Sequence, residues 1–242
     1  MHDPQRSLHF PSLLNARDLG GYPTTDGAET RWRSLLRADD LVQLTDEGLR
    51  AMADFGIETV VDLRWPEEVA QFPSPISAGL PHVQYHQISL LARTSAEWDE
   101  MRDSCTKEMW KCTVLDNART ELATVLQVIA RSSPGPLLFH CVAGKDRTGV
   151  IAALLLAIAD VVPESIARDY ALSTTRLRDA YLQRYSKEDP AEVLEAVRCP
   201  EEGVHNMLTY LRQSGGIRSY LSQIGLTNAE IARLRARLRQ PQ

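Results

Sequence analysis

The chain has 242 residues, of which 43% are hydrophobic, and a formal net charge of −5 at pH 7. A chain of this length can bury a substantial core. Its acidic balance argues against a general nucleic-acid-binding protein, for which a basic surface is the usual signature.

The first half of the chain alternates short apolar runs with helical patterns. A turn signal at 25–28 separates two short strand candidates within residues 22–36. Residues 45–55 predict a helix with Thr45 as its N-cap and with Leu49, Met52 and Ala53 on its inner face.

Three buried strands are expected next, at residues 57–63, 82–88 and 137–141. Within the second, the even spacing of His82 and His86 places both side chains on one face, where ordinary packed histidines are favoured over metal ligands. Between the second and third strands, apolar residues from 122 to 129 recur at the spacing of one helix face. This order predicts an α/β fold with a central, mostly parallel sheet flanked by helices.

The last third of the chain is expected to be helical. No internal repeat or linker divides it from the rest, so residues 1–242 predict one domain, with an α/β core at 1–162 and a helical extension at 163–242. Thr227 and Glu230 have the spacing of a capping box. The predicted helices cover residues 163–173, 174–185, 190–197, 200–213, 217–225 and 227–238.

Two stretches of the sequence bear on the cellular location of the protein and on access to a pocket. The longest apolar run, 150–162, is interrupted by Asp160 and is too short to span a bilayer, and the first residues contain no signal segment. We therefore expect a cytoplasmic protein, with export without a signal peptide as the alternative. Residues 94–113 are amphipathic, and they predict either a helical lid over a pocket or a plain surface helix.

Residues 140–149 read HCVAGKDRTG, directly after an apolar run and directly before another. Cys141 is thus expected where a buried strand turns into a helix. The first amides of a helix lack intrahelical partners and carry the positive end of its dipole. Such amides bind a phosphate dianion and favour a thiolate.

Each loop residue can be given a role from its chemistry. The Arg147 guanidinium offers a planar fork of donors that matches two phosphate oxygens. Gly144 tolerates either sign of φ. The small side chain of Ala143 leaves room for the backbone amides of the loop, including the Val142 amide, to converge on one anion. The Thr148 hydroxyl can donate to the Cys141 sulfur or cap the helix.

The Cys-x5-Arg-Thr spacing resembles the cysteine-dependent tyrosine phosphatases. The spelling AGKDRT narrows the resemblance to their bacterial branch, that of mycobacterial protein tyrosine phosphatase B and the Listeria lipid phosphatase. Residues 15–22, 33–38, 60–64 and 207–221 fit the same branch. The resemblance implies activity on phosphotyrosine, often on phosphoserine or phosphothreonine, and on phosphoinositides. It also implies that Lys145 contacts additional inositol phosphates and that Asp146 is the general acid.

Other carboxylates compete with Asp146 for the role of acid. Asp62 and Asp18 are alternatives, and Glu67 is a weaker one because Pro66 fits better as the first residue of a helix. Asp62 and Arg64 are expected at the carboxyl edge of the sheet, where ligands bind, or else as a surface ion pair. His140, next to the nucleophile, is expected to support it by hydrogen bonding or to be a core histidine.

The predicted reaction is phosphomonoester hydrolysis through a phosphocysteine intermediate. It requires no cofactor, and the histidines show no zinc-type spacing. A rhodanese-type sulfurtransferase and a non-catalytic phosphoprotein-binding module remain as alternatives. The expected partner is a phosphorylated protein or a phosphoinositide, and the oligomeric state is not indicated. We expect the other three cysteines to be core residues, or else disulfide partners of Cys141 under oxidation; they are Cys105, Cys112 and Cys199.

Overall fold

The computed structural model describes residues 4–80, 82–90, 100 and 104–239. Its centre is a five-stranded sheet in the order β1-β2-β5-β3-β4. β1 pairs antiparallel with β2, and the other pairs are parallel, so the expected α/β fold with a mostly parallel sheet is confirmed. The strands are β1 (Arg17–Asp18), β2 (Leu35–Ala38), β3 (Thr59–Asp62), β4 (Gln84–Gln87) and β5 (Leu137–His140).

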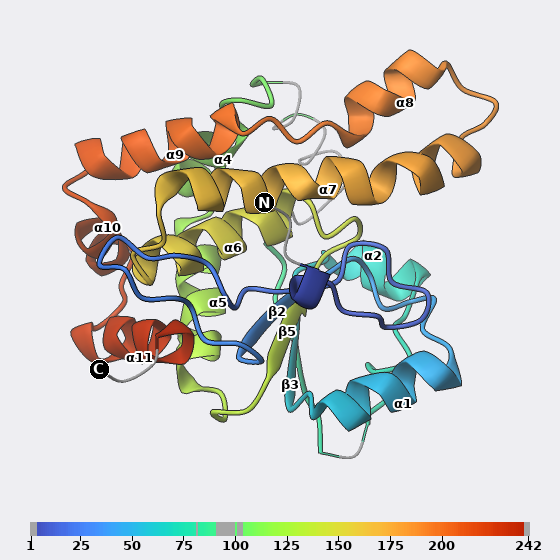
Figure 1. Cartoon of the computed structure of the whole chain (residues 1–242), viewed down its shortest axis with the longest axis horizontal. Coiled ribbons are helices and arrows are strands. Elements are labelled where there is room, and N and C mark those ends of the chain that lie inside the picture. Colours follow the sequence, from blue (N-terminus) through green and yellow to red (C-terminus); the bar gives the residue numbers. More distant parts are fainter. Residues whose placement is uncertain (1–3, 81, 91–99, 101–103, 240–242) are drawn as a thin grey trace.

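Helices cover both faces of this sheet (Figure 1). One face carries α1, and the other carries α5 and α6, with the C-terminal helices packed outside them. The helices are α1 (Asp46–Phe55), α2 (Pro66–Gln71), α4 (Trp110–Asn117), α5 (Arg119–Arg131), α6 (Asp146–Ile158), α7 (Pro163–Arg184), α8 (Pro190–Val197), α9 (Glu202–Gln213), α10 (Ile217–Gln223) and α11 (Asn228–Leu238), after a 3-10 turn at Pro4–Arg6.

The central strand β5 shows why the core has two parts. Successive strand residues point to opposite faces, so Leu137 and Phe139 enter the larger apolar cluster beneath α5 and α6, while Leu138 enters the smaller one beside α1. All four residues of β5 are buried. A strand buried on both faces reads as a continuous apolar run, which explains why it was predictable.

Several local predictions are confirmed. Thr45 caps α1 by accepting a hydrogen bond from the Gly48 amide, and Pro66 is the first residue of α2. Thr227 and Glu230 form the expected capping box of α11. Local signals were sufficient here because each cap depends on residues within one helical turn.

Other local predictions are wrong. The helices expected at 163–173 and 174–185 form one continuous helix, α7, since neither glycine nor proline interrupts its interior. Ala53 is exposed on α1, not on its inner face. Residues 22–36 contain only isolated bridges around the turn, such as Pro23 with Glu29, before β2 begins.

His82 and His86 do not share a strand face. β4 begins only at Gln84, and His82 lies in a turn with a φ of 69°. Of the proposed lid at 94–113, residues 94–99 and 101–103 lie outside the described part. Its end belongs to α4, where Trp110 is buried, and α4 packs against α9 and α5. In the described ranges, no helix is both long and apolar enough to cross a membrane.

Candidate active site

Residues 141–145 connect the end of β5 to the start of α6. The Cys141 side chain is buried at the base of this turn, with the residue 3% exposed. Val142 stands at the rim and is 38% exposed, and its carbonyl accepts a hydrogen bond from the Asp40 amide at 2.8 Å. The turn therefore brings a thiol to the N-terminus of a buried helix, as expected.

Gly144 has a φ of +62° and lies against the backbone that follows β2. A Cβ atom at this position would come within 2.3 Å of the Ala38 carbonyl oxygen and 2.6 Å of the Asp39 nitrogen. Only glycine satisfies both the left-handed conformation and this close approach.

Arg147 is buried in the first turn of α6 and is held by Glu68 of α2. Its Nη1 and Nη2 atoms donate to the two Glu68 carboxylate oxygens at 2.6 and 2.8 Å. The guanidinium also stacks over the Trp65 ring, 4.5 Å from its centroid. A carboxylate thus fixes the orientation of the guanidinium through a bidentate pair.

Glu68 was not identified from the sequence as part of the site. Its carboxylate does accept the Trp65 amide at 2.9 Å, which is a capping contact, but it also carries Arg147. The two residues are 79 positions apart, and no local pattern indicates their pairing.

Lys145 and Asp146 lie side by side where α6 begins. The Lys145 Nζ atom donates to the Ala196 carbonyl at 2.6 Å and lies 3.4 Å from the Asp146 carboxylate. On its other side, Asp146 accepts a hydrogen bond of 3.2 Å from the Tyr170 hydroxyl. Lys145 thereby connects the loop to the C-terminal end of α8.

A buried lysine that the sequence did not indicate lies behind Asp146. The Lys111 Nζ atom sits 3.1 Å from the centroid of the Tyr170 ring and finds no hydrogen-bond partner among the described residues. Burial lowers the pKa of Lys111 to about 7, against the opposite effect of Asp146.

The pKa of Asp146 responds to this cluster. Burial acts to raise it, but the charges of Lys145 and Lys111 and the Tyr170 hydrogen bond outweigh burial and lower the pKa below its ordinary value. The Asp146 carboxyl is therefore ionised at neutral pH.

Asp62, Arg64 and His140 form a layer beneath the loop. Asp62 and Arg64 make a buried ion pair at 2.7 Å, not the surface pair considered from the sequence. Tyr85 also donates to Asp62, at 2.7 Å, and His140 places Nε2 3.7 Å from the Asp62 carboxylate and Nδ1 3.1 Å from the Cys141 carbonyl. The Nδ1 contact holds the ring next to Cys141, while Nε2 faces the Asp62 carboxylate without a hydrogen-bond partner among the described residues.

The other candidate acids lie in different surroundings. Burial acts to raise the pKa of Asp62, yet His140 and Arg64 outweigh it and lower the value to about 2. Asp18 accepts the Gly20 and Arg33 amides, and its strand β1 is separated from β5 by β2. Glu67 is exposed on α2.

Thr148 differs from expectation. Its hydroxyl is buried without a hydrogen-bond partner among the described residues, so neither the bond to the Cys141 sulfur nor a helix cap is formed. The N-cap position of α6 is Lys145. A side chain three residues into the helix points along its buried face, which the sequence alone did not reveal.

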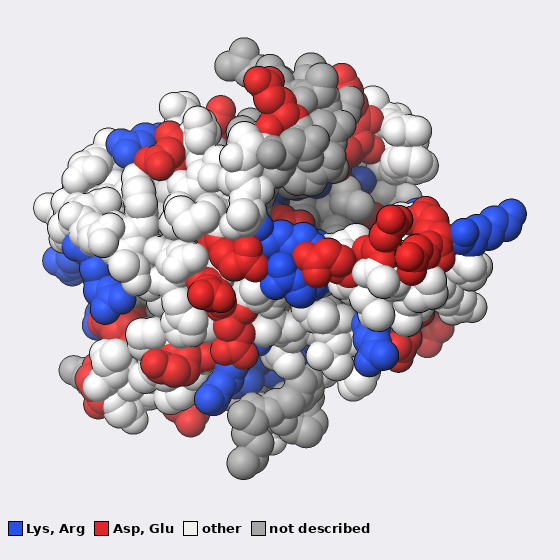
Figure 2. All heavy atoms as spheres, turned by 90° about the horizontal axis from the view of Figure 1, so that it is seen from above, with Lys and Arg blue, Asp and Glu red and all other residues white. Residues whose placement is uncertain are grey.

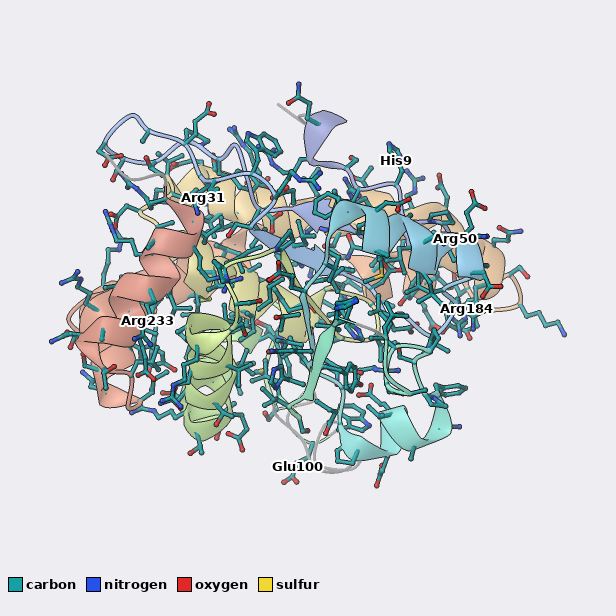
Figure 3. The ribbon with its side chains drawn as sticks, turned by 90° about the horizontal axis from the view of Figure 1, so that it is seen from below. His9, Arg31, Arg50, Glu100, Arg184 and Arg233 are labelled. Atoms are coloured by element: carbon teal, nitrogen blue, oxygen red, sulfur yellow. The ribbon has the colours of Figure 1, made fainter. Side chains whose placement is uncertain are left out.

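Charged side chains on the described surface are mixed in sign. Figure 2 shows acidic and basic groups interspersed over one face, not gathered into a broad basic patch. The exposed cations labelled in Figure 3, Arg50, Arg184 and Arg233, lie at the periphery of the ribbon, away from the sheet. Over the residues that the structure describes, no group of three or more His, Cys, Asp or Glu side chains could hold a metal ion.

Comparison with known proteins places these features in context. A family model described as the tyrosine phosphatase family matches residues 8–240. A tyrosine-protein phosphatase of Nostoc commune is 33% identical over 220 residues, covering 86% of this chain and 74% of the relative. Triple specificity protein phosphatase PtpB of Mycobacterium tuberculosis is 26% identical over 272 residues, covering 93% and 96%. The crystal structure of P. aeruginosa TpbA has 15% identity, covers 68% of this chain and 86% of its own, and gives a TM-score of 0.37.

Proposed function

The chain belongs to the tyrosine phosphatase family and is a phosphoric monoester hydrolase, and from this premise we propose that Cys141 is its nucleophile. The observation that carries the proposal is the turn between β5 and α6, where the Cys141 thiol is buried beside a helix N-terminus and near enough to the Arg147 guanidinium for their charges to interact. Such an arrangement stabilises an anion both before and during reaction.

In the proposed reaction, the Cys141 thiolate attacks phosphorus in line with the ester oxygen. A sulfur–phosphorus bond forms as the phosphorus–oxygen bond breaks, while the loop amides and Arg147 hold the equatorial oxygens. Asp146 transfers its proton to the departing alcohol or phenol. Water then attacks the phosphocysteine with Asp146 accepting its proton, which releases phosphate and restores the thiolate.

Asp146 must carry a proton for the first step, although its surroundings lower the pKa of its carboxyl. A phosphate dianion bound beside this carboxylate repels its negative charge and thereby favours its protonated form. Tyr170, which already donates to the carboxylate at 3.2 Å, keeps the group oriented. Substrate binding and acid protonation are therefore coupled in the proposal.

We propose phosphotyrosine as the main substrate group, with phosphoserine, phosphothreonine and phosphoinositides as further ones. The similarity to a phosphatase named for triple specificity supports breadth. Lys145 supports the phosphoinositide part, since its ammonium group stands next to the loop, where a second phosphate would lie. To make that contact, Lys145 has to release the Ala196 carbonyl.

The family match favours this function over a sulfurtransferase and over a silent phosphoprotein-binding module. Cytoplasmic location stays part of the proposal and rests on the chemical need to keep Cys141 reduced. A single domain over residues 1–242 is also proposed, supported by a family match that runs over residues 8–240.

A panel of phosphopeptides and phosphoinositides tests the function. Wild type is compared with Cys141→Ser, which is expected to abolish turnover, and with Asp146→Asn. The second variant is expected to slow substrates with poor leaving groups much more than substrates with good ones. Full turnover by Cys141→Ser would refute the nucleophile, and equal slowing by Asp146→Asn would refute the acid.

A further inference from the structure

Two successive carbonyl groups of the catalytic loop are bound from behind by buried side chains. Asn15 Nδ2 donates to the Ala143 carbonyl at 2.9 Å and to the Gly144 carbonyl at 3.1 Å. Arg37 Nη2 donates to the same Gly144 carbonyl at 2.7 Å. Both side chains are fully buried, and neither was identified from the sequence as part of the site.

Anchoring these carbonyls determines where the neighbouring amides point. In a trans peptide the C=O and N–H bonds point in opposite directions. The Ala143 carbonyl shares its peptide with the Gly144 amide, and the Gly144 carbonyl shares its peptide with the Lys145 amide. With the carbonyls held toward Asn15 and Arg37, both amides are directed away from them, as an anion-binding turn requires.

One carboxylate, Asp169 of α7, fixes the two donors. It lies 2.5 Å from Arg37 Nη1 and 2.8 Å from Arg17 Nε, and Arg17 in turn donates to the Asn15 side-chain oxygen at 2.6 Å. This last contact orients the Asn15 amide, so that its nitrogen faces the loop. Asp169 is thus connected to Gly144 through Arg37 and to Ala143 through Arg17 and Asn15.

The network is also electrostatically suited to an anion. Burial acts to raise the pKa of Asp169, but Arg17 and Arg37 outweigh it and keep the carboxyl ionised. Two guanidinium groups against one carboxylate leave one net positive charge among these three groups. This charge is buried behind the turn, where solvent screens it weakly.

We propose that Asn15, Arg37 and Asp169 are positioning residues that aim the loop amides at the phosphate of the substrate. The proposal rests on the phosphatase function proposed above and deepens it. These residues do not touch the substrate, and they act through the two carbonyls they bind or orient. The N-terminal segment and α7 are then parts of the phosphate site, although Asn15 lies 128 positions before Ala143.

The competing explanation is that the network only attaches α7 to the N-terminal segment. Arg176 provides a matched control, because it makes this same attachment without touching the loop. Its guanidinium on α7 donates to the Ala16 carbonyl at 2.9 Å and to the Ser7 hydroxyl at 2.6 Å.

The experiment compares Asn15→Leu and Arg37→Met with Arg176→Met in the full-length protein. Competitive inhibition by inorganic phosphate, kcat and KM for an aryl phosphate, and Tm are measured for each. Asn15→Leu and Arg37→Met are expected to weaken phosphate inhibition by about tenfold or more, because two anion-binding amides lose their alignment. Arg176→Met is expected to lower Tm while leaving the inhibition constant within about twofold, since its loss changes attachment but not the loop.

The inhibition constant separates the two explanations. A variant that is merely less stable loses active molecules, which lowers the apparent kcat but leaves the inhibition constant and KM of the remaining molecules unchanged. If Asn15→Leu does not fold, Asn15→Ser replaces it, since the shorter hydroxyl cannot bridge both carbonyls. The expected result for Asn15→Ser is the same weakening.

Phosphate inhibition unchanged in a folded Asn15 variant, with an active wild type, would overturn the positioning role and leave the phosphatase function intact. A wild type without activity on any phosphomonoester, or a Cys141→Ser variant with full turnover, would overturn the proposed function itself. The two failures are therefore distinguishable.

Discussion

Replacing Gly144 with alanine perturbs the tightest backbone contact of the site. The new Cβ would lie 2.3 Å from the Ala38 carbonyl oxygen, whereas ordinary contacts begin at 3.4 Å. The loop must therefore move by about 1 Å. Displacements of this size cost about 10²-fold in rate when they misplace catalytic groups.

The stability effect has two parts. An alanine at a φ of +62° costs about 1–2 kcal/mol for its left-handed conformation. The forced displacement of packed backbone adds about 1–3 kcal/mol. Together they predict a loss of about 2–5 kcal/mol, or a Tm lower by about 4–20 °C for a chain of this size.

Gly27→Ala is the control that separates the effect of the close contact from the cost of a positive φ. Gly27 has a φ of +83°, but no described atom lies within 4 Å of its Cβ position. This variant is expected to lose only about 1–2 kcal/mol and to keep its activity. The measurements are kcat/KM on an aryl phosphate and thermal unfolding. If Gly144→Ala keeps kcat/KM within a few-fold of Gly27→Ala, the close approach does not control the loop and the reasoning fails.

Three further variants test individual groups. Glu68→Gln removes the charge that fixes Arg147 and is expected to lower kcat/KM by about tenfold, the value of one charged hydrogen bond, whereas an undiminished kcat/KM would show that the pair is dispensable. Lys111→Met removes a charge that lowers the pKa of Asp146, so the alkaline limb of the pH–rate profile is expected to move to higher pH, and a stationary limb would contradict this coupling. Burial raises the pKa of Asp18 from 3.8 to about 6. The favourable contribution of the protonated carboxyl to the free energy of unfolding is therefore complete below pH 3.8 and is lost as pH rises through 6. Wild type is therefore expected to lose more Tm than Asp18→Asn between pH 4 and 7, and parallel melting curves would refute that assignment.

The parts of the fold that were predictable depend on local patterns. β5 is apolar up to His140 and α6 is apolar from Val150 onward, and Thr45 and Thr227 cap their helices through contacts within one turn. β1 was missed because both of its residues, Arg17 and Asp18, are charged. Polar residues occupy a buried strand only when partners elsewhere satisfy them, and here Asp169 is 152 positions from Arg17.

The same distinction applies to the site. The position of Cys141 and Gly144 in the turn before α6, and of Arg147 in its first turn, was predictable from the sequence because all three lie within one short loop motif. Glu68 and Lys111 could not be predicted, since each reaches the loop only through the order of the strands and the packing of α4. The expected Thr148 bond failed for a related reason, because side-chain direction on a buried helix is decided by its surroundings.

The loop is held by residues that precede it and by residues that follow it in the sequence, and this has a consequence for biosynthesis. Asn15 binds a carbonyl 128 positions downstream, and Asp169 follows the loop in the order of translation. A nascent chain that has just exposed Cys141 lacks α7, so its thiol emerges before the frame that orients the turn. The ability to bind phosphate is therefore expected to form late, once these contacts of long sequence separation are made. Fragments that end before α7 are expected to contain the nucleophile but no ordered phosphate-binding loop.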